Sequence, residues 1–323
     1  MMGAHEYSGR TALNRALDRA LATDFRVILL GQDLADPVGG PHGVTRGLST
    51  AHGDHRVVNL PASVTAMCGA AVGAAIEGMV PVVELPAAPV GSAVLDQMAH
   101  VVVFQEQRRA TTYGSLVFRV PVPAPEVLAD SHLDRFTRIP GLKVIQPDTP
   151  AAAETLLLAA IRDPAPSIVL EPVGLYRALG PPAAATESGS TLDASEFTSP
   201  RADATVVTCH ASRAAAMRAA ADLAADGVEI DIIDLRGGGP LDTEAVFRSV
   251  ARTRRLVLAP GTAALRAPCL EIAELVNRDL VGQLAAPVEH VREQPGSSGP
   301  GPADIISAVR TACGYSRSRV PGR

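Results

Sequence analysis

The sequence predicts an α/β protein with two domains, each built around a parallel sheet. Short, continuous apolar runs such as FRVILLG (25–31) and SIVLEP (167–172) alternate with longer segments in which apolar residues recur at helical spacing. That alternation is typical of buried parallel strands covered by helices. The chain has 323 residues, enough for two hydrophobic cores. Residues 179–203, rich in Pro, Ser, Ala and Thr, separate two such series and are the expected linker.

The first series begins with a helix over 11–24, where Leu13, Leu17 and Leu21 share one face. A helix over 149–163 is favoured by Pro150 near its first turn. The other elements expected in this series are strands at 25–31, 56–60, 80–85, 115–122, 142–147 and 167–172, and helices at 65–78 and 91–109.

The second series repeats the pattern, and Gly227 is expected to end its first helix. Its expected strands are 204–209, 229–236, 255–260 and 287–291, and its expected helices are 212–227, 243–253, 269–279 and 302–313. The predicted organisation is an N-terminal extension (1–10), a first domain (11–178), the linker (179–203), a second domain (204–315) and a disordered basic tail (316–323).

Composition argues against several classes of function. The net charge of −5 and the low aromatic content of 3% give no reason to expect a nucleic acid or an anionic membrane as partner. The N-terminus MMGAHEYSGR has no apolar signal core, which predicts a cytoplasmic protein. The apolar stretch 64–95 contains Glu77 and Glu84 and several prolines, so a buried helix and strand are expected there instead of a membrane span. The four cysteines are far apart in sequence and form no zinc-binding pattern, and Cys68 and Cys209, which lie in apolar contexts, are expected to be buried thiols.

The segment VVNLPASVTAMCGAAVGAAIEG (57–78) is predicted to form a strand, a short loop and a helix of small apolar residues. A turn of this kind at the carboxyl end of a strand often carries functional groups. Here Ser63 and Thr65 are the only side chains near the turn that could take part in chemistry. The segment therefore has the frame of an active site without a titratable group.

Seven pieces of the chain together resemble the β subunit of the thiamine-diphosphate-dependent 2-oxoacid dehydrogenases, with the C-terminal half of a two-gene transketolase as a near relative. The pieces are VILLGQDL (27–34), GVTRGL (43–48), GAAVGAAIEGMVPVVE (69–84), LDQM (95–98), IPGLKVIQPDTP (139–150), AAIRDPAPSIVLEP (159–172) and IDIIDLRGGGPLD (230–242). The resemblance implies a pyrimidine-binding transketolase-like domain followed by a transketolase C-terminal-type domain.

The resemblance also identifies the loop before the small-residue helix as part of a cofactor site. In that family the loop reads P-I-S-E, and its glutamate hydrogen-bonds the aminopyrimidine ring of thiamine diphosphate and promotes activation of the cofactor. Here the loop reads PASV (61–64), so Ser63 is kept and Val64 stands at the position of the glutamate. A valine side chain can neither donate nor accept a hydrogen bond.

Other departures concern the same implied site. Gln32 stands where the family usually has an acid, and Ala88 and Val90 stand near positions where the family places aromatic side chains that line the cofactor. By spacing from IPGL, the family's catalytic histidine falls near Leu128. His132 is four residues away, and a shifted alignment of the loop would make it the catalytic histidine.

The resemblance implies partners and ions as well. The chain has no diphosphate motif of the G-D-G…N type, so Mg²⁺ and the diphosphate are expected on a partner α-like chain. The helix over 69–78 corresponds to one that lies at subunit contacts of an α2β2 assembly, and close packing inside one subunit is the alternative. The segment AAIRDPA (159–165) matches a potassium-binding loop, which implies K⁺ at Ala160, Ile161, Asp163 and Ala165. An acyl-carrier or lipoyl domain is a further expected partner.

Two functions are compatible with these residues. The first is a divergent enzyme subunit of the dehydrogenase or transketolase type that cleaves a 2-oxoacid or ketose and transfers the C2 or acyl unit, in specialised metabolism. The second is a non-catalytic subunit kept for assembly or regulation of such a complex.

Overall fold

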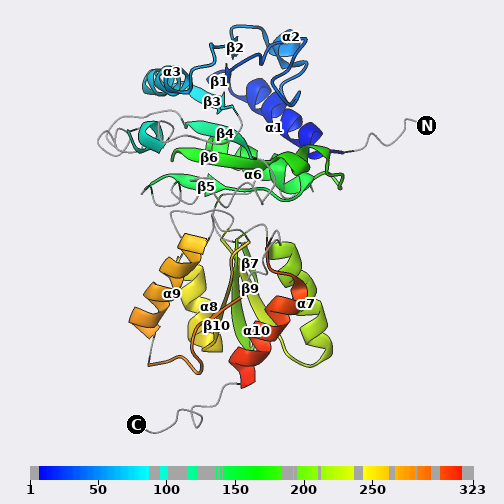
Figure 1. Ribbon diagram of the computed structural model, residues 1–323, viewed down its shortest axis with the longest axis vertical. Coiled ribbons are helices and arrows are strands. Elements are labelled where there is room, and N and C mark those ends of the chain that lie inside the picture. Colours follow the sequence, from blue (N-terminus) through cyan, green and yellow to red (C-terminus); the bar gives the residue numbers. More distant parts are fainter. Residues whose placement is uncertain are drawn as a thin grey trace, which may run out of the picture. The chain divides into compact units, whose positions relative to one another are not determined.

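The chain forms two structural units in the computed structural model, Met1–Leu192 and Asp193–Arg323 (Figure 1). The structure describes residues 7–86, 95–100, 115–122, 136, 139, 141–183, 192, 195–209, 212–235, 243–261, 266–280, 282–291 and 299–314. Within these residues, no helix is long and apolar enough to cross a membrane.

The first unit is built on a six-stranded sheet in the order β2-β1-β3-β4-β6-β5, in which all neighbouring strands are parallel. Its strands are β1 (Val27–Gly31), β2 (Val57–Asn59), β3 (Val80–Glu84), β4 (Val117–Val122), β5 (Lys143–Ile145) and β6 (Ser167–Pro172). Its helices are α1 (Gly9–Thr23), α2 (Leu48–His52), α3 (Val64–Ile76), α6 (Pro150–Arg162) and the 3-10 helix η2 (Val173–Arg177). This sheet confirms the predicted fold class.

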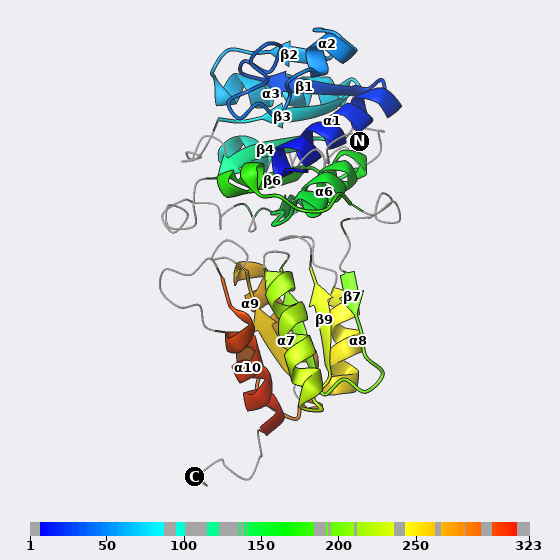
Figure 2. The same cartoon turned by 90° about the vertical axis from the view of Figure 1, so that its right-hand side faces the viewer.

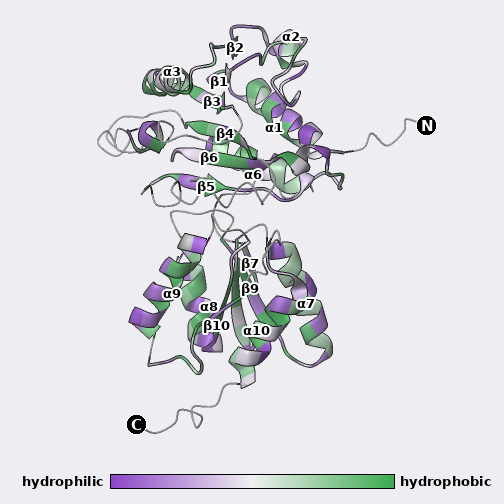
Figure 3. Cartoon of the chain, viewed as in Figure 1, coloured by the Kyte–Doolittle hydropathy of each residue, from purple (hydrophilic) through white to green (hydrophobic). Residues whose placement is uncertain are grey.

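Helices α1 and α6 pack side by side against one face of this sheet (Figure 2). Both begin with a side-chain cap: Ser8 Oγ accepts from the Thr11 amide at 3.2 Å, and Thr149 Oγ1 accepts from the Ala152 amide at 3.3 Å. Such caps satisfy amides that lack a partner in the first helical turn. Strands β4 and β6 are mostly hydrophobic in Figure 3, because both faces of the sheet are covered.

The second unit has a five-stranded sheet in the order β11-β10-β8-β9-β7. Its elements are β7 (Ser195–Phe197), β8 (Ala204–Thr208), α7 (Arg213–Ala225), β9 (Ile230–Asp234), α8 (Thr243–Thr253), β10 (Leu256–Ala259), α9 (Arg266–Leu280), β11 (Glu289–His290) and α10 (Pro302–Gly314). Helices α7 and α10 cover one face of this sheet, and α8 and α9 the other. Strand β7 pairs antiparallel with β9, and the other pairings are parallel.

Strand β7 corrects one feature of the predicted organisation. Residues 195–203 belong to the second unit, although they were expected to be linker. The three residues of β7 include one apolar side chain, so no alternating pattern marks the strand in the sequence. Helix α1 likewise starts at Gly9, inside the expected N-terminal extension. The tail 316–323 and most of the helix expected over 91–109 lie outside the described residues, and residues 95–100 of that helix are helical.

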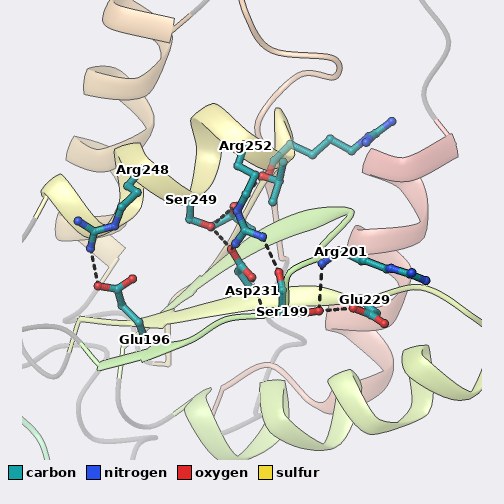
Figure 4. A network of polar contacts seen from close by, with 11 residues as sticks. Glu196, Ser199, Arg201, Glu229, Asp231, Arg248, Ser249 and Arg252 are labelled. Carbon is teal, nitrogen blue, oxygen red and sulfur yellow. Dashed lines mark hydrogen bonds and ion pairs between the residues drawn. The ribbon is translucent and has the colours of Figure 1, made fainter.

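A buried polar network holds residues 199–203 against the second sheet (Figure 4). The Asp231 carboxylate is fully buried on β9 and accepts from the Ser199 amide at 2.9 Å, from the Ser249 hydroxyl at 2.5 Å and from the Arg252 guanidinium. A buried carboxylate is stable only when such donors replace its water shell. The network thus fixes the start of the second unit beyond the three residues of β7.

Candidate functional site

Three strands of the first sheet end side by side and define the edge where a site is expected. Gly31 at the end of β1 is paired with Asn59 of β2 and with Glu84 of β3. The loops that follow β1 and β2 therefore start from neighbouring positions, as in other open α/β sheets that bind ligands at the carboxyl edge. The Leu60 amide donates to the Gly31 carbonyl at 2.7 Å and joins the two strand ends.

The structure brings Gln32, Ser63 and Val64 to this edge. Gln32 is exposed, and its side-chain amide donates to the Asp33 carboxylate at 3.3 Å. Ser63 is the N-cap of α3 and accepts from the Ala66 amide at 3.4 Å. Val64 is the first residue of α3 and is partly exposed, and the first turn of this helix contains no acid. The start of α3 thus offers an apolar contact where the resemblance implies a proton-transfer group.

Four positions at the implied site lie outside the described residues. They are Ala88, Val90, Leu128 and His132. Their roles, including that of His132 as a catalytic histidine, stay predictions. Among the described residues, no group of three or more His, Cys, Asp or Glu side chains could hold a metal ion.

A buried ion cluster lies at the same edge, on the face covered by α1 and α6. Of its residues, only Glu84 was considered in the sequence, as a charge that argues against a membrane span. The Arg119 side chain of β4 is 1% exposed and donates to Glu84 Oε2 at 2.7 Å, to Glu171 Oε1 at 2.7 Å and to Glu171 Oε2 at 2.9 Å. The Tyr176 hydroxyl of η2 also donates to Glu171 Oε2, at 2.7 Å. The sequence did contain a signal for this cluster, because each of the largely apolar strands β3, β4 and β6 carries a single charged residue.

Electrostatics inside this cluster follow from its burial. Burial alone lowers the pKa of Arg119, but the carboxylates of Glu171 and Glu84 outweigh burial and raise this pKa above its ordinary value. Burial, followed by the negative charge of Glu171, raises the pKa of Tyr176. Both side chains therefore stay protonated across the physiological range.

The loop GGPHG (39–43) covers the cluster. The His42 ring stacks on the Tyr176 ring, with 4.6 Å between ring centroids and 26° between ring planes. Burial lowers the pKa of His42, while Glu171 raises it and Arg119 lowers it further. A neutral imidazole therefore lies over the tyrosine near pH 7. The loop is thus a structural cover of this edge of the sheet.

The segment expected to bind K⁺ lies where α6 ends. The Ala160 carbonyl accepts from the Ser115 hydroxyl at 3.0 Å, and the Asp163 carboxylate is 2.5 Å from Lys143 Nζ and accepts from the Ala165 amide at 2.9 Å. The Asp163 side chain is thus already paired with a cation of the chain itself. The K⁺ site at Ala160, Ile161, Asp163 and Ala165 stays a prediction, which would rest on backbone carbonyls.

Near that segment, at the start of the strands, lies a cavity of about 420 Å³. Residues that line it are Ala20, Thr23, Asp24, Arg26, Val27, Val80, Ser115, Leu158, Ile161, Arg162 and Pro164. Because β1 and β3 start here, the cavity is at the opposite edge of the sheet from Ser63. It is therefore separate from the candidate site.

Comparisons with known proteins agree with the resemblance and confirm the fold. The transketolase pyrimidine-binding domain family matches residues 5–178, and the transketolase C-terminal domain family matches residues 194–310. The chain is 32% identical over 283 residues to the pyruvate dehydrogenase E1 component subunit beta of Acholeplasma laidlawii, covering 86% of each chain. It is 34% identical over 304 residues to the acetoin:2,6-dichlorophenolindophenol oxidoreductase subunit beta of Cupriavidus necator, covering 89% of each.

Structural similarity extends over both units. A solved structure described as a split-gene transketolase, an inactive beta4 tetramer, has a TM-score of 0.72 and 18% identity over 96% of this chain and 99% of that chain. At this identity the match shows a shared fold.

Proposed function

Because this chain belongs to the family of pyruvate dehydrogenase E1 component β subunits, with transketolase pyrimidine-binding and C-terminal domains, we propose that it is the β-type subunit of a thiamine-diphosphate-dependent enzyme. Together with an α-like partner chain it cleaves a 2-oxoacid or ketose and transfers the resulting C2 or acyl unit, in specialised metabolism. The observation that supports this most directly is the Ser63-capped start of α3 at the carboxyl edge of the sheet.

When bound, thiamine diphosphate supplies the carbon that attacks the substrate carbonyl and accepts the electron pair left by cleavage. The described residues fit only the apolar part of the cofactor's pyrimidine. Val64 would contact the ring, Ser63 holds the start of α3, and Gln32 offers an exposed amide nearby. Because it has no acid at position 64, the chain lacks a positioned proton-transfer group, which would lower the reaction rate by about 10²–10⁴-fold. A slow, dedicated pathway would tolerate such a rate.

The partner completes what this chain lacks. The α-like chain would hold Mg²⁺ and the diphosphate, and an acyl-carrier or lipoyl domain would receive the product. K⁺ bound at the carbonyls of residues 160–165 would support the end of α6.

Mixing the chain with its α-like partner, thiamine diphosphate and Mg²⁺ tests the proposal. Reduction of 2,6-dichlorophenolindophenol with a 2-oxoacid or a ketose as substrate is expected, and no turnover with either class of substrate would contradict the proposal.

We expect the isolated chain to bind thiamine diphosphate weakly or not at all, because it lacks the diphosphate motif. Calorimetric titration with the cofactor and Mg²⁺ should show no submicromolar binding by the chain alone. Adding the α-like partner should restore tight binding. Submicromolar binding by the chain alone would contradict this division of the site.

The exposed face of α3 is the surface proposed for self-association as a dimer within an α2β2 assembly. Ala66, Gly69, Ala70 and Gly73 are exposed along this face, and a Cβ added at Gly73 would meet no atom within 4 Å. A helix made of small residues lets another backbone approach closely. The same open face means that a larger side chain at Gly73 fits the isolated chain.

Gly73→Leu is therefore expected to weaken association without unfolding the chain. Overpacking a close helix contact costs roughly 1–3 kcal/mol, whereas leucine favours the helix itself over glycine. Sedimentation velocity should show a shift toward monomer. Ala221→Leu on the exposed face of α7 is the matched control and should leave the assembly unchanged. A wild-type chain that stays monomeric with and without the partner would rule out this surface.

The alternative function is a non-catalytic subunit for assembly or regulation of such a complex. The apolar start of α3 favours it, because its first turn contains no acid that could share a proton with the cofactor. The two functions differ in whether the assembled complex activates bound cofactor at all.

A further inference from the structure

The buried ion cluster of Glu84, Arg119, Glu171 and Tyr176 distributes its hydrogen bonds unequally. Glu171 accepts three: two from Arg119 at 2.7 and 2.9 Å and one from Tyr176 at 2.7 Å. Glu84 accepts one, at 2.7 Å from Arg119 to Oε2. The second oxygen, Glu84 Oε1, is buried and has no hydrogen-bond partner among the residues that the structure describes. A buried carboxylate oxygen without a donor carries a large desolvation penalty.

Packing leaves Glu84 Oε1 facing the backbone of the loop at Gly40. A Cβ built at Gly40 would lie 2.9 Å from Oε1, and Gly40 has φ +76°, a conformation that favours glycine. The Gly40 amide is already committed to the Asp33 carbonyl at 2.8 Å, so it does not donate to Oε1. The loop therefore packs against this oxygen, and the Gly40 amide donates no hydrogen bond to it.

Charge balance inside the cluster is also unequal. With both carboxyl groups ionised, one guanidinium would face two carboxylates, all at most 4% exposed as residues. Among the described residues, the charged groups that act on Glu84 are Arg119 on β4 and Glu171 on β6. On the remaining sides, β1 contributes Gly31, η2 contributes the protonated Tyr176, and the loop contributes the uncharged ring of His42. Arg46 of the same loop is exposed and reaches the Val38 carbonyl at 3.5 Å.

We propose that Glu84 is a neutral carboxylic acid in the folded chain, and that its proton keeps residues 39–43 seated on the cluster. Proton loss would place a second negative charge beside Glu171 and against the Gly40 backbone. Water must then reach this charge, and the loop, which packs against Oε1 at Gly40, would have to move to admit it. Protonated Glu84 would thus keep the loop that follows β1 closed, and ionised Glu84 would let it open.

The direction of the pH effect follows from linkage. Burial raises the pKa of Glu84 above its ordinary value of 4.5, against the lowering effect of Arg119, and Glu171 adds to the rise. Between the ordinary and the folded-state pKa, the folded chain holds one proton more than the unfolded chain. The contribution of Glu84 to the free energy of unfolding is therefore fully present below the ordinary pKa and is lost as the pH rises through the folded-state pKa. In this interval the unfolding constant should rise about tenfold per pH unit.

Glu84→Gln tests the proposal, because glutamine has the shape of the neutral acid and does not titrate. The variant should match the wild type below the ordinary glutamate pKa. Above it, the ratio of wild-type to variant unfolding constants should climb with pH. Glu171→Gln is the matched control and should be destabilised throughout, because Arg119 then loses its bidentate counter-ion. A Glu84→Gln variant that is destabilised by the same factor at every pH would show that Glu84 is ionised and overturn the proposal.

Two further measurements report on the opening of the loop and on the protonation of Glu84. Hydrogen exchange at the Gly40 and Gly43 amides, each hydrogen-bonded in the closed loop, should become faster in the wild type than in Glu84→Gln as the pH rises. Equal amide exchange rates in the wild type and in Glu84→Gln at all pH values would contradict control of the loop by the Glu84 proton. If Glu84→Gln does not fold, infrared spectra of wild-type chain with ¹³C-labelled glutamate decide the case. A carboxylic-acid C=O band that persists after the exposed glutamates have ionised is expected, and its absence would overturn the proposal.

Discussion

Val64→Glu should accelerate exchange of the thiamine C2 proton in the assembled complex by about 10²-fold, the lower end of the effect of a positioned proton-transfer group. Val64 is the first residue of α3, next to the capping Ser63 at the carboxyl edge of the sheet. An acid introduced there would have the position that the resemblance assigns to the activating glutamate. The exchange is carried out in heavy water, quenched at set times and measured by NMR.

The chain should tolerate this substitution. Val64 is partly exposed, so the new carboxyl is not forced into the core of the isolated chain. The N-terminus of a helix also favours a negative charge by roughly 0.3–1 kcal/mol. Cofactor and partner would bury the carboxyl only after assembly, which would raise its pKa toward that of a group sharing a proton with the ring.

Controls separate the two candidate functions. Val64→Gln places an amide of the same length at the position and should give little acceleration, because it does not transfer a proton. If the chain is a working subunit, the wild-type complex should already exceed the free cofactor in exchange rate. Exchange at the free-cofactor rate in both the wild-type and Val64→Glu complexes would rule out the enzyme function and favour the non-catalytic subunit.

The second large effect is expected at Arg119. Arg119→Leu should lower the free energy of unfolding of the first unit by about 3–5 kcal/mol, the usual cost of removing one partner of a buried ion pair. Glu84 and Glu171 would remain buried without a cation, and Tyr176 alone would still donate to Glu171. Urea denaturation followed by circular dichroism measures the loss, with separate transitions fitted for the two units if they unfold independently.

Arg26→Leu is the matched control for Arg119→Leu. Arg26 pairs with Asp24 at 2.8 Å, but the two side chains are 46% and 30% exposed. Such a pair contributes about 0–1 kcal/mol, because water and salt screen it. Equal destabilisation by the two substitutions would show that the cluster around Arg119 is solvated, contrary to its burial.

The fold class and the family could be predicted from the sequence because their signals are local. Strands buried on both faces appear as continuous apolar runs, as in β1 and β6, and helices such as α1 show apolar residues at helical spacing. That Val64 replaces the family's glutamate stays a prediction, which rests on Pro61 and Ser63 of the family's loop pattern. Strand β7 was not visible, because three residues have no periodicity and depend on pairing with β9.

The sequence by itself thus determined the two α/β domains, the implied cofactor edge and the absence of an acid at position 64. Only the tertiary structure decided which distant side chains meet. Glu84 and Glu171 are 35 and 52 residues from Arg119 in sequence, and parallel strand register brings them to one guanidinium. Cys209 and Cys269, far apart in sequence, likewise lie with their sulfurs 3.7 Å apart. A residue pattern reports the environment of its own strand or helix, whereas the partner of a buried charge depends on the order and register of strands from different parts of the chain.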